Sequence, residues 1–139
     1  LTLLDSLNKR LTFLETVCRE VDLPVNLIHA RAEEGGQNPA LREKYDVACA
    51  RAVAALPTLS EYCLPFVKVG GYVLAMKGTA AMEELEEAKK AIKTLGLKLE
   101  EVREFPVDGT AHTVIVLKKV SPTPAGYPRR FAKIKQNPL

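Results

Sequence analysis

The residues best suited to chemistry in this chain are polar side chains that each follow a short apolar stretch. They are Asp5, Glu33, Arg51 and Lys77. Short apolar stretches bounded by polar residues are typical of buried strands. In open α/β sheets, ligands bind across the carboxyl ends of the strands, so side chains at these positions could hold a nucleotide-like molecule.

Asp5 is a candidate for holding a ribose. A short carboxylate fixed at a strand end can accept hydrogen bonds from both hydroxyls of a ribose diol. The alternative is that Asp5 only caps the following helix, since Asp is a good N-cap residue. Lys9 and Arg10 follow in the first helical turn, where cations oppose the helix dipole. Their position favours an anionic partner at this end of the helix.

Ala32, Glu33 and Arg51 each allow two interpretations. Ala32 and Glu33 follow the strand expected beside an adenine ring, where a backbone amide and a carboxylate could contact the ring edge. Otherwise they belong to a solvated acidic loop. Arg51 ends an apolar strand, where it could meet an anionic group of a ligand. Otherwise it forms an ion pair with Asp46 or Glu61.

The spacing of apolar residues predicts alternating strands and helices. An apolar stripe from Leu7 to Val21 predicts the first helix, and Arg31 to Pro39 form a polar loop. We expect strands at 1–5, 25–30, 45–50 and 72–76, and helices at 7–21, 56–66 and 81–95.

The last two strands, 98–105 and 112–118, should form a hairpin, because Asp108-Gly109 between β-rich runs is typical of one. The order of these strands and helices along the chain predicts an α/β fold with a doubly wound, mostly parallel sheet and one antiparallel hairpin strand at its edge. Domains that bind NAD usually stay parallel. The antiparallel strand is typical instead of the Rossmann-like class I methyltransferases that use S-adenosylmethionine.

Composition narrows the class of protein. The 139 residues fit one domain, and no apolar run approaches the roughly 20 residues that cross a bilayer. Cys18, Cys49 and Cys63 lie in apolar settings without a C-x-x-C spacing, so we expect core thiols in a reducing compartment, the cytoplasm. His29 and His112 are isolated, and we expect no metal site.

Basic residues concentrate at the C-terminal end. Six basic residues and no acidic ones follow Asp108, which leaves fourteen basic against seventeen acidic residues in the rest of the chain. We therefore divide the chain into a domain at 1–120 and a basic, Pro- and Gly-rich, extended tail at 121–139. Such a tail favours a polyanionic partner, with Arg129 and Arg130 on phosphate. The alternative is a solubilising terminus that Tyr127 packs against the sheet.

Several motifs in this order resemble one family, RsmG, also called GidB. Its members are bacterial methyltransferases acting on guanine N7 in 16S ribosomal RNA of the small subunit. The resemblance runs over all 139 residues. The motifs are Leu3 to Arg10, Phe13-Leu14, Arg31-Ala32-Glu33, Arg42 to Asp46, Ala50 to Ala54, Leu64-Pro65, Lys68 to Gly71, Met76-Lys77-Gly78 and Tyr127-Pro128-Arg129.

The resemblance implies a pocket for S-adenosylmethionine. Asp5, with Ser6, matches the ribose-binding acid, Ala32 and Glu33 match the adenine side, and Arg51 matches a cofactor-binding arginine. The family also carries an upstream helical region and a strand followed by a Gly-x-Gly loop, which these 139 residues lack. We expect that strand in the centre of the sheet, between the strands ending at Asp5 and Arg51, and we expect this chain alone to be inactive.

The implied reaction needs no general base, because guanine N7 carries a free lone pair. Catalysis would come from holding N7 in line with the methyl group. A cation on guanine O6 would fix the base, and Lys77 and Arg51 are candidates for it. The alternative for Lys77 is an ordinary surface lysine. Lys9 and Arg10 are further candidates for contacts with RNA.

Two other functions stay open. One is a non-catalytic RNA-binding fragment, and the other is a fragment of a nicotinamide-dependent oxidoreductase, which the predicted hairpin disfavours. For the methyltransferase we expect a monomer whose partner is 16S ribosomal RNA or the small ribosomal subunit, without membrane or metal.

Overall fold

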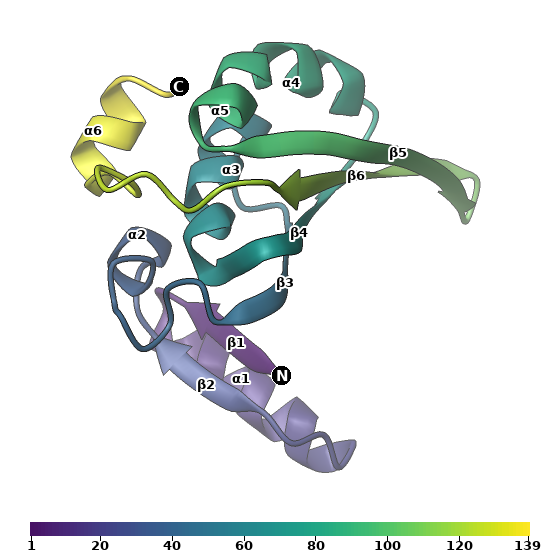
Figure 1. Ribbon diagram of the computed structural model, residues 1–139. Coiled ribbons are helices and arrows are strands. Elements are labelled where there is room, and N and C mark those ends of the chain that lie inside the picture. Colours follow the sequence, from purple (N-terminus) through teal and green to yellow (C-terminus); the bar gives the residue numbers. More distant parts are fainter.

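The structure is a computed structural model that describes residues 1–139 (Figure 1). The first elements are β1 (Thr2–Asp5), α1 (Asn8–Glu20), β2 (Asn26–His29) and α2 (Ala32–Gly35). Next come β3 (Tyr45–Arg51), α3 (Leu56–Cys63), the 3-10 turn η1 (Leu64–Phe66) and β4 (Val67–Lys77). The last are α4 (Ala81–Glu87), α5 (Lys89–Thr94), β5 (Leu97–Val107), β6 (Thr110–Lys119) and α6 (Phe131–Gln136). None of the helices is both long enough and apolar enough to cross a membrane.

The strands form two sheets. β1 and β2 pair in parallel, and the second sheet has the order β3-β4-β6-β5. In it β3 and β4 are parallel, while β6 is antiparallel to both of its neighbours. The α/β fold with an antiparallel hairpin strand is confirmed, although the reversed strand, β6, lies one place in from the edge formed by β5. In Figure 1, α3, α4 and α5 cover one side of the four-stranded sheet, and β1, β2 and α1 lie together below it.

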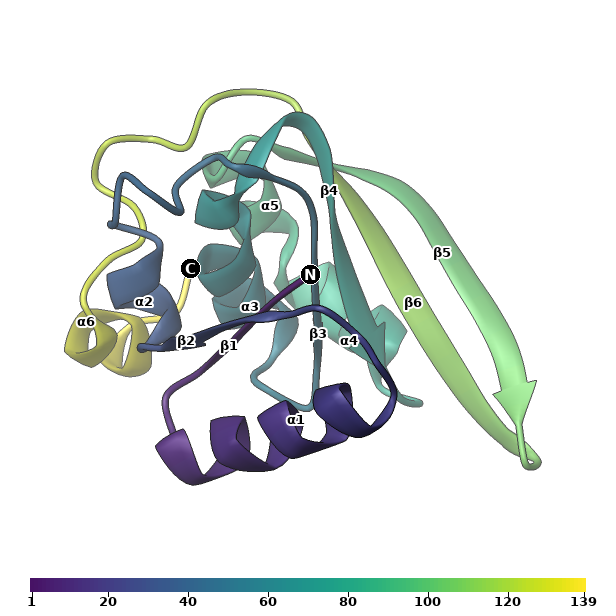
Figure 2. The same cartoon turned by 90° about the horizontal axis from the view of Figure 1, so that it is seen from below.

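Two of the strands that have an unpaired edge are β1 and β3. β1 pairs only with β2, and β3 pairs only with β4. These strands end at Asp5 and Arg51, and it is between them that the sequence predicts a central strand. In Figure 2 both run downward toward α1.

The hairpin of β5 and β6 projects well beyond the rest of the molecule (Figure 2). Its turn consists of Asp108 and Gly109, with φ angles of 49° and 75°. Two successive positive φ values match the right-handed twist of the flanking strands, and Asp-Gly is among the sequences that adopt them most easily. The predicted hairpin is confirmed.

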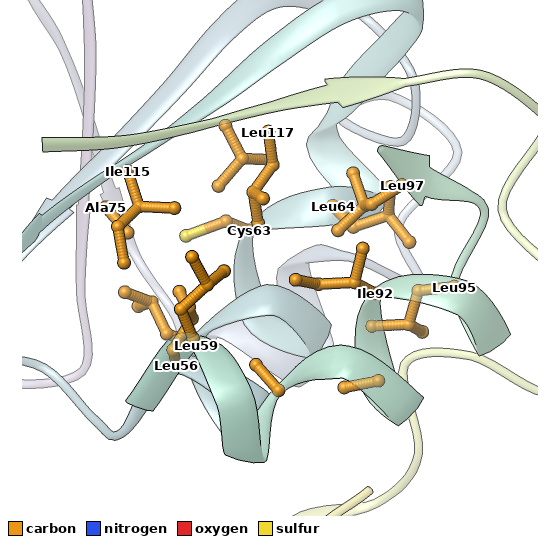
Figure 3. Close-up of a cluster of buried hydrophobic side chains, with 14 of the residues drawn as sticks. Leu56, Leu59, Cys63, Leu64, Ala75, Ile92, Leu95, Leu97, Ile115 and Leu117 are labelled. Atoms are coloured by element: carbon orange, nitrogen blue, oxygen red, sulfur yellow. The ribbon is translucent and has the colours of Figure 1, made fainter. Parts of the chain in front are cut away.

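The main core lies between the four-stranded sheet and helices α3 to α5 (Figure 3). It is a cluster of 16 buried side chains, none of which precedes Leu56. Leu64, Ile115 and Leu117 are fully buried in it, and each such side chain contributes about 1.5–3 kcal/mol relative to exposure. Its largest fully buried members are Leu56, Leu59, Leu64, Val67, Val73, Leu95, Ile115 and Leu117.

Three expected segments differ from the structure. The predicted helix 81–95 is two helices that meet at Ala88, where the chain bends so that both α4 and α5 pack against α3. The predicted polar loop at 31–39 contains the helical turn α2. The tail is extended only as far as Arg130, because Phe131–Gln136 form α6 and Ile134 is fully buried.

The predicted burial also needs correction at two places. Only Leu11 and Cys18 of the α1 stripe are buried, whereas Leu7 and Val21 are exposed. Cys18 and Cys63 are buried as predicted, and burial raises the pKa of the Cys63 thiol to about 12. Cys49 is exposed. Alternate residues of β3 face opposite sides of the sheet, and it is Ala48 and Ala50 that pack against the core.

Candidate functional site

Asp5 ends β1 and shapes the turn into α1. Its Oδ1 accepts a hydrogen bond from the Leu7 N–H at 2.8 Å. The N-cap residue of α1 is Leu7, which has no side-chain cap, so the capping interpretation of Asp5 is wrong. Oδ2 has a single long contact of 3.5 Å, to Nη1 of the exposed Arg10. Because exposed pairs of this kind are weak, Oδ2 can accept a hydrogen bond from a ligand hydroxyl.

Glu33 lies in the first turn of α2, and its side chain is only 6% exposed. Arg31 donates a hydrogen bond from Nε to Oε1 of Glu33, and this bond raises the pKa of Arg31. The helix also packs tightly on β1, since a Cβ on Gly35 would lie 2.9 Å from Cδ1 of Leu4. The interpretation of this segment as a solvated loop is wrong, because Glu33 and Gly35 are buried.

Arg51 ends β3 and is exposed, and its side chain makes no hydrogen bond or ion pair within the chain. Both of the carboxylates considered as its partners are engaged elsewhere. Asp46 pairs with a lysine of β4, and Glu61 pairs with Arg129. The next residue, Ala52, has a φ of 54°, a left-handed conformation that costs a residue other than glycine about 1 kcal/mol or more. The structure therefore holds a free cation at this strand end.

Lys77 is not free. Its side chain is 9% exposed, and Nζ contacts Glu84 Oε2 at 2.7 Å and donates to the Ala54 carbonyl oxygen at 2.6 Å. The same Glu84 oxygen accepts the Leu56 N–H at the start of α3. Lys77 therefore joins the end of β4 to α3 and α4. It is not a surface lysine, and its ammonium group is occupied within the protein and so is not free to contact guanine.

Arg129 is also engaged within the protein. Its guanidinium forms hydrogen bonds of 2.6–3.1 Å with both oxygens of Glu61, and the two side chains are 12% and 1% exposed. The bond to Glu61 raises the pKa of Arg129. The predicted phosphate contact of Arg129 does not fit this geometry. Tyr127 packs against the main core, as the alternative interpretation of the tail expected.

Arg42 and Lys119 fix the start of the tail. Arg42 donates to four carbonyl oxygens, three of them in the tail, including Tyr127 at 2.8 Å. Lys119 is fully buried, and its Nζ contacts Glu43 at 2.5 Å and Thr123 Oγ1 at 2.7 Å. Burial alone would raise the pKa of Glu43, but hydrogen bonds from Lys119 and Thr123 lower it to about 2. Lys119, one of the six basic residues counted after Asp108, is therefore buried in an ion pair and is not free to bind a polyanion.

Four further basic side chains of α1 and the tail lie on the surface. Lys9, Arg130, Lys133 and Lys135 are exposed and form no ion pair within the chain. Three of the four belong to α6 or the residue before it. In both Figure 1 and Figure 2, α6 lies beside α2, so these cations are close to the helix that carries Glu33.

A cavity opens between α2 and the tail. Its lining combines the charged residues of α2 with the tail from Pro128 onward, and includes Arg31, Glu33, Gln37, Arg130 and Phe131. Sequence reasoning missed Phe131, whose ring lies 3.8 Å below the guanidinium of Arg31. The only signal was one aromatic residue next to Arg129-Arg130 in a basic tail. No group of three or more His, Cys, Asp or Glu side chains could hold a metal ion.

Solved structures with this arrangement define the class of the fold. A putative class I S-adenosylmethionine-dependent methyltransferase from Listeria monocytogenes matches with a TM-score of 0.63 at 16% identity, over 86% of this chain and 44% of that one. M. jannaschii TYW2 in complex with AdoMet matches with a TM-score of 0.60 at 18% identity, over 86% of this chain and 57% of that one. At these identities the likeness concerns the fold, which is that of the class I methyltransferases.

Sequence comparison defines the family. The family model GidB, rRNA small subunit methyltransferase G, matches residues 1–113. Ribosomal RNA small subunit methyltransferase G of Acetivibrio thermocellus is 54% identical over 140 residues, which cover 99% of this chain and 57% of the relative. That of Alkaliphilus oremlandii is 51% identical over 142 residues, 100% of this chain and 59% of the relative. This chain belongs to the small-subunit rRNA methyltransferase G family, and it spans under 60% of the length of these curated relatives.

Proposed function

We propose that this chain is part of an enzyme that transfers a methyl group from S-adenosylmethionine to N7 of a guanine in 16S ribosomal RNA. One observation carries the proposal. In a member of this family, three strands that follow one another in the sequence each lead to a polar group that the fold leaves available: Asp5, Glu33 and Arg51. The names of the relatives supply the ribosomal RNA of the small subunit as the substrate class.

The residues present fit the cofactor by the chemistry of their donors and acceptors. Oδ2 of Asp5, with Ser6, would hold the ribose hydroxyls. The backbone of Ala32 and the carboxylate of Glu33 would hold the adenine edge. Glu33 suits that task because Arg31 occupies Oε1 and leaves Oε2 without a partner within the chain.

The cofactor, when bound, supplies a methyl group on a positively charged sulfur that the N7 lone pair attacks directly. No residue has to remove a proton first, and we assign no general base. The chain contributes by fixing the reacting partners. Arg51 is the free cation at the strand ends, where it can contact the cofactor or hold guanine O6.

The exposed cations bind the RNA backbone. Lys9 lies on α1, and Arg130 lies next to Lys133 and Lys135 at α6. Each phosphate contact releases counterions, so binding should weaken as salt rises. We propose that the enzyme acts in the cytoplasm as a monomer on 16S ribosomal RNA or the small ribosomal subunit, with no metal ion.

Equilibrium binding of S-adenosylmethionine to the complete natural protein tests the cofactor site. We expect Asp5→Ala, Glu33→Ala and Arg51→Ala each to weaken binding at least tenfold, while Glu101→Ala on the distant hairpin strand β5 leaves it unchanged. If all three variants bind as tightly as the unsubstituted protein, the strand-end assignment fails. Binding of NAD in place of S-adenosylmethionine would favour the oxidoreductase alternative.

A further inference from the structure

One contact of the tail with the residues around α2 is made by an aromatic ring. The ring of Phe131 lies 3.8 Å from the guanidinium carbon of Arg31. Arg31 in turn donates its Nε hydrogen bond to Oε1 of Glu33. A planar guanidinium on an aromatic face is attracted by the ring quadrupole, and stacking also restricts its rotation. The three residues therefore form a chain of contacts that runs from the tail to the carboxylate of Glu33.

The tail is held firmly enough to position this ring. Glu61 binds both the side chain and the backbone N–H of Arg129, two residues before Phe131. Gln37 donates to the Pro128 carbonyl oxygen at 2.8 Å. On the other side, Ile134 is fully buried. Because anchors lie on both sides of Phe131, its ring is a fixed surface for Arg31.

Glu33 is aimed at the cavity between α2 and the tail. Its side chain is more than nine-tenths buried, and it lines that cavity together with Arg31 and Phe131. Oε1 is occupied by Arg31, and Oε2 has no hydrogen-bond donor within the chain. No buried side-chain oxygen of the chain lacks a hydrogen-bond partner, so Oε2 is reached from the cavity, where a ligand can donate a hydrogen bond to it.

We propose that Phe131 and Arg31 are positioning residues for cofactor recognition. By holding Oε1, they turn Oε2 toward the 6-amino group of the adenine, which donates a hydrogen bond to it. The pair thereby gives the site its preference for a 6-aminopurine over a 6-oxopurine, whose oxygen would face the carboxylate with no hydrogen to donate. This assignment rests on the proposed function, because it takes the adenine of S-adenosylmethionine as the group near Glu33.

The test compares binding of S-adenosylmethionine with that of its 6-oxopurine analogue, S-inosylmethionine, to the complete natural protein. The readout is the ratio of the two dissociation constants. We expect Phe131→Ala to lower this preference about fivefold and Arg31→Lys to lower it by a similar factor, because lysine keeps the charge but lacks the planar fork. Phe131→Tyr, which keeps the ring, should retain the preference. Gln136→Ala, an exposed change on the same helix, is the matched control.

A merely structural role for Phe131 gives a different result. Loosened packing would weaken both ligands by the same factor and leave the ratio unchanged. If Phe131→Ala keeps the full preference while Glu33→Gln abolishes it, the positioning assignment is overturned and the proposed function stands. If the unsubstituted protein binds neither ligand, the proposed cofactor site fails and this assignment fails with it.

A second readout needs no ligand. The Nε proton of Arg31 should give an NMR signal shifted by the ring current of Phe131 and protected by its bond to Glu33. Phe131→Ala should move this signal toward the position of a free arginine, and Phe131→Tyr should leave it near its original place. An Arg31 signal that is the same in Phe131→Ala as in the unsubstituted chain would overturn the stacking contact itself.

Discussion

The N-terminal unit (residues 1–30) and the C-terminal unit (residues 45–139) bury their apolar side chains very differently. All 16 members of the main core belong to the C-terminal unit. In the N-terminal unit only Leu11 and Cys18 are buried, whereas Phe13 is 67% and Val21 is 63% exposed. The stability of this chain therefore resides in the C-terminal unit.

The candidate site does not follow this division. Asp5 belongs to the N-terminal unit, Arg51 belongs to the C-terminal unit, and Glu33 lies on α2 between them. α2 lies against Leu4 of β1 at Gly35, and Gln37, two residues after α2, donates a hydrogen bond to the tail. The geometry of the candidate site therefore depends on the packing of α2 between the sparsely packed N-terminal unit and the well-packed C-terminal unit.

Breaking the Glu61–Arg129 pair should have the largest effect on the C-terminal unit. Glu61→Ala leaves a nearly buried arginine without its partner, and we expect a loss of about 4 kcal/mol in the free energy of unfolding. Urea unfolding of the chain measures it. Glu101→Ala, in an exposed pair with Arg103, is the control and should cost less than about 0.5 kcal/mol. A loss below about 1 kcal/mol for Glu61→Ala would refute the tail anchor.

A pair of substitutions compares the two units directly. Leu117→Ala removes a fully buried side chain of the main core, and we expect it to cost about 3 kcal/mol. Phe13→Ala removes a larger side chain that is 67% exposed, and it should cost less than about 0.5 kcal/mol. Chemical denaturation of both variants tests the comparison. Equal losses would mean that α1 is as well packed as the sheet.

The Glu43–Lys119 pair predicts a loss of stability in acid. The pKa of Glu43 is lowered to about 2 from an ordinary value of 4.5. Its stabilising contribution is therefore complete above about pH 4.5 and is lost as the pH falls toward 2. Because Glu43 is partly exposed, its contribution to the free energy of unfolding is smaller than the full pKa shift implies, and we expect about 2 kcal/mol. Glu43→Gln should flatten this part of the curve of unfolding free energy against pH. An unchanged slope would contradict the pairing.

Ala52→Gly should give the smallest effect, and it should be stabilising. Glycine adopts the φ of 54° at this position without strain. The relief of about 1 kcal/mol is partly offset by the greater entropy of glycine in the unfolded chain, so we expect a net gain of about 0.5 kcal/mol. Thermal unfolding would detect it. A lower melting temperature would show that Ala52 is not strained.

Local signals predicted most of the fold. The Asp108-Gly109 turn fixed the hairpin, because its φ values follow from residue type. Gly96 has a φ of 72° after α5, where a glycine commonly ends a helix. The end of β1 at Asp5 also followed from the apolar run before it. The bend at Ala88 could not be predicted, because it depends on packing against α3.

In the candidate site, the sequence predicted the location of a residue only where its position relative to a strand end determines that location. Asp5, Glu33 and Arg51 lie at or just after strand ends, as the sequence indicates. The engagement of Lys77 and Arg129 could not be predicted, because the sequence does not show which carboxylate a cation will meet. The partner of Arg129 is 68 residues away, and one carbonyl partner of Arg42 is 85 residues away.

The most direct test of the proposed methyl transfer uses a bacterial strain that lacks its own small-subunit methyltransferase G. The complete natural protein, or its Glu33→Ala variant, is expressed in that strain, and 16S ribosomal RNA is digested and analysed by mass spectrometry for 7-methylguanosine. We expect the natural protein to restore the modified nucleoside and the variant to leave it close to background. Failure of the natural protein to restore 7-methylguanosine, at normal expression, would contradict the proposed function.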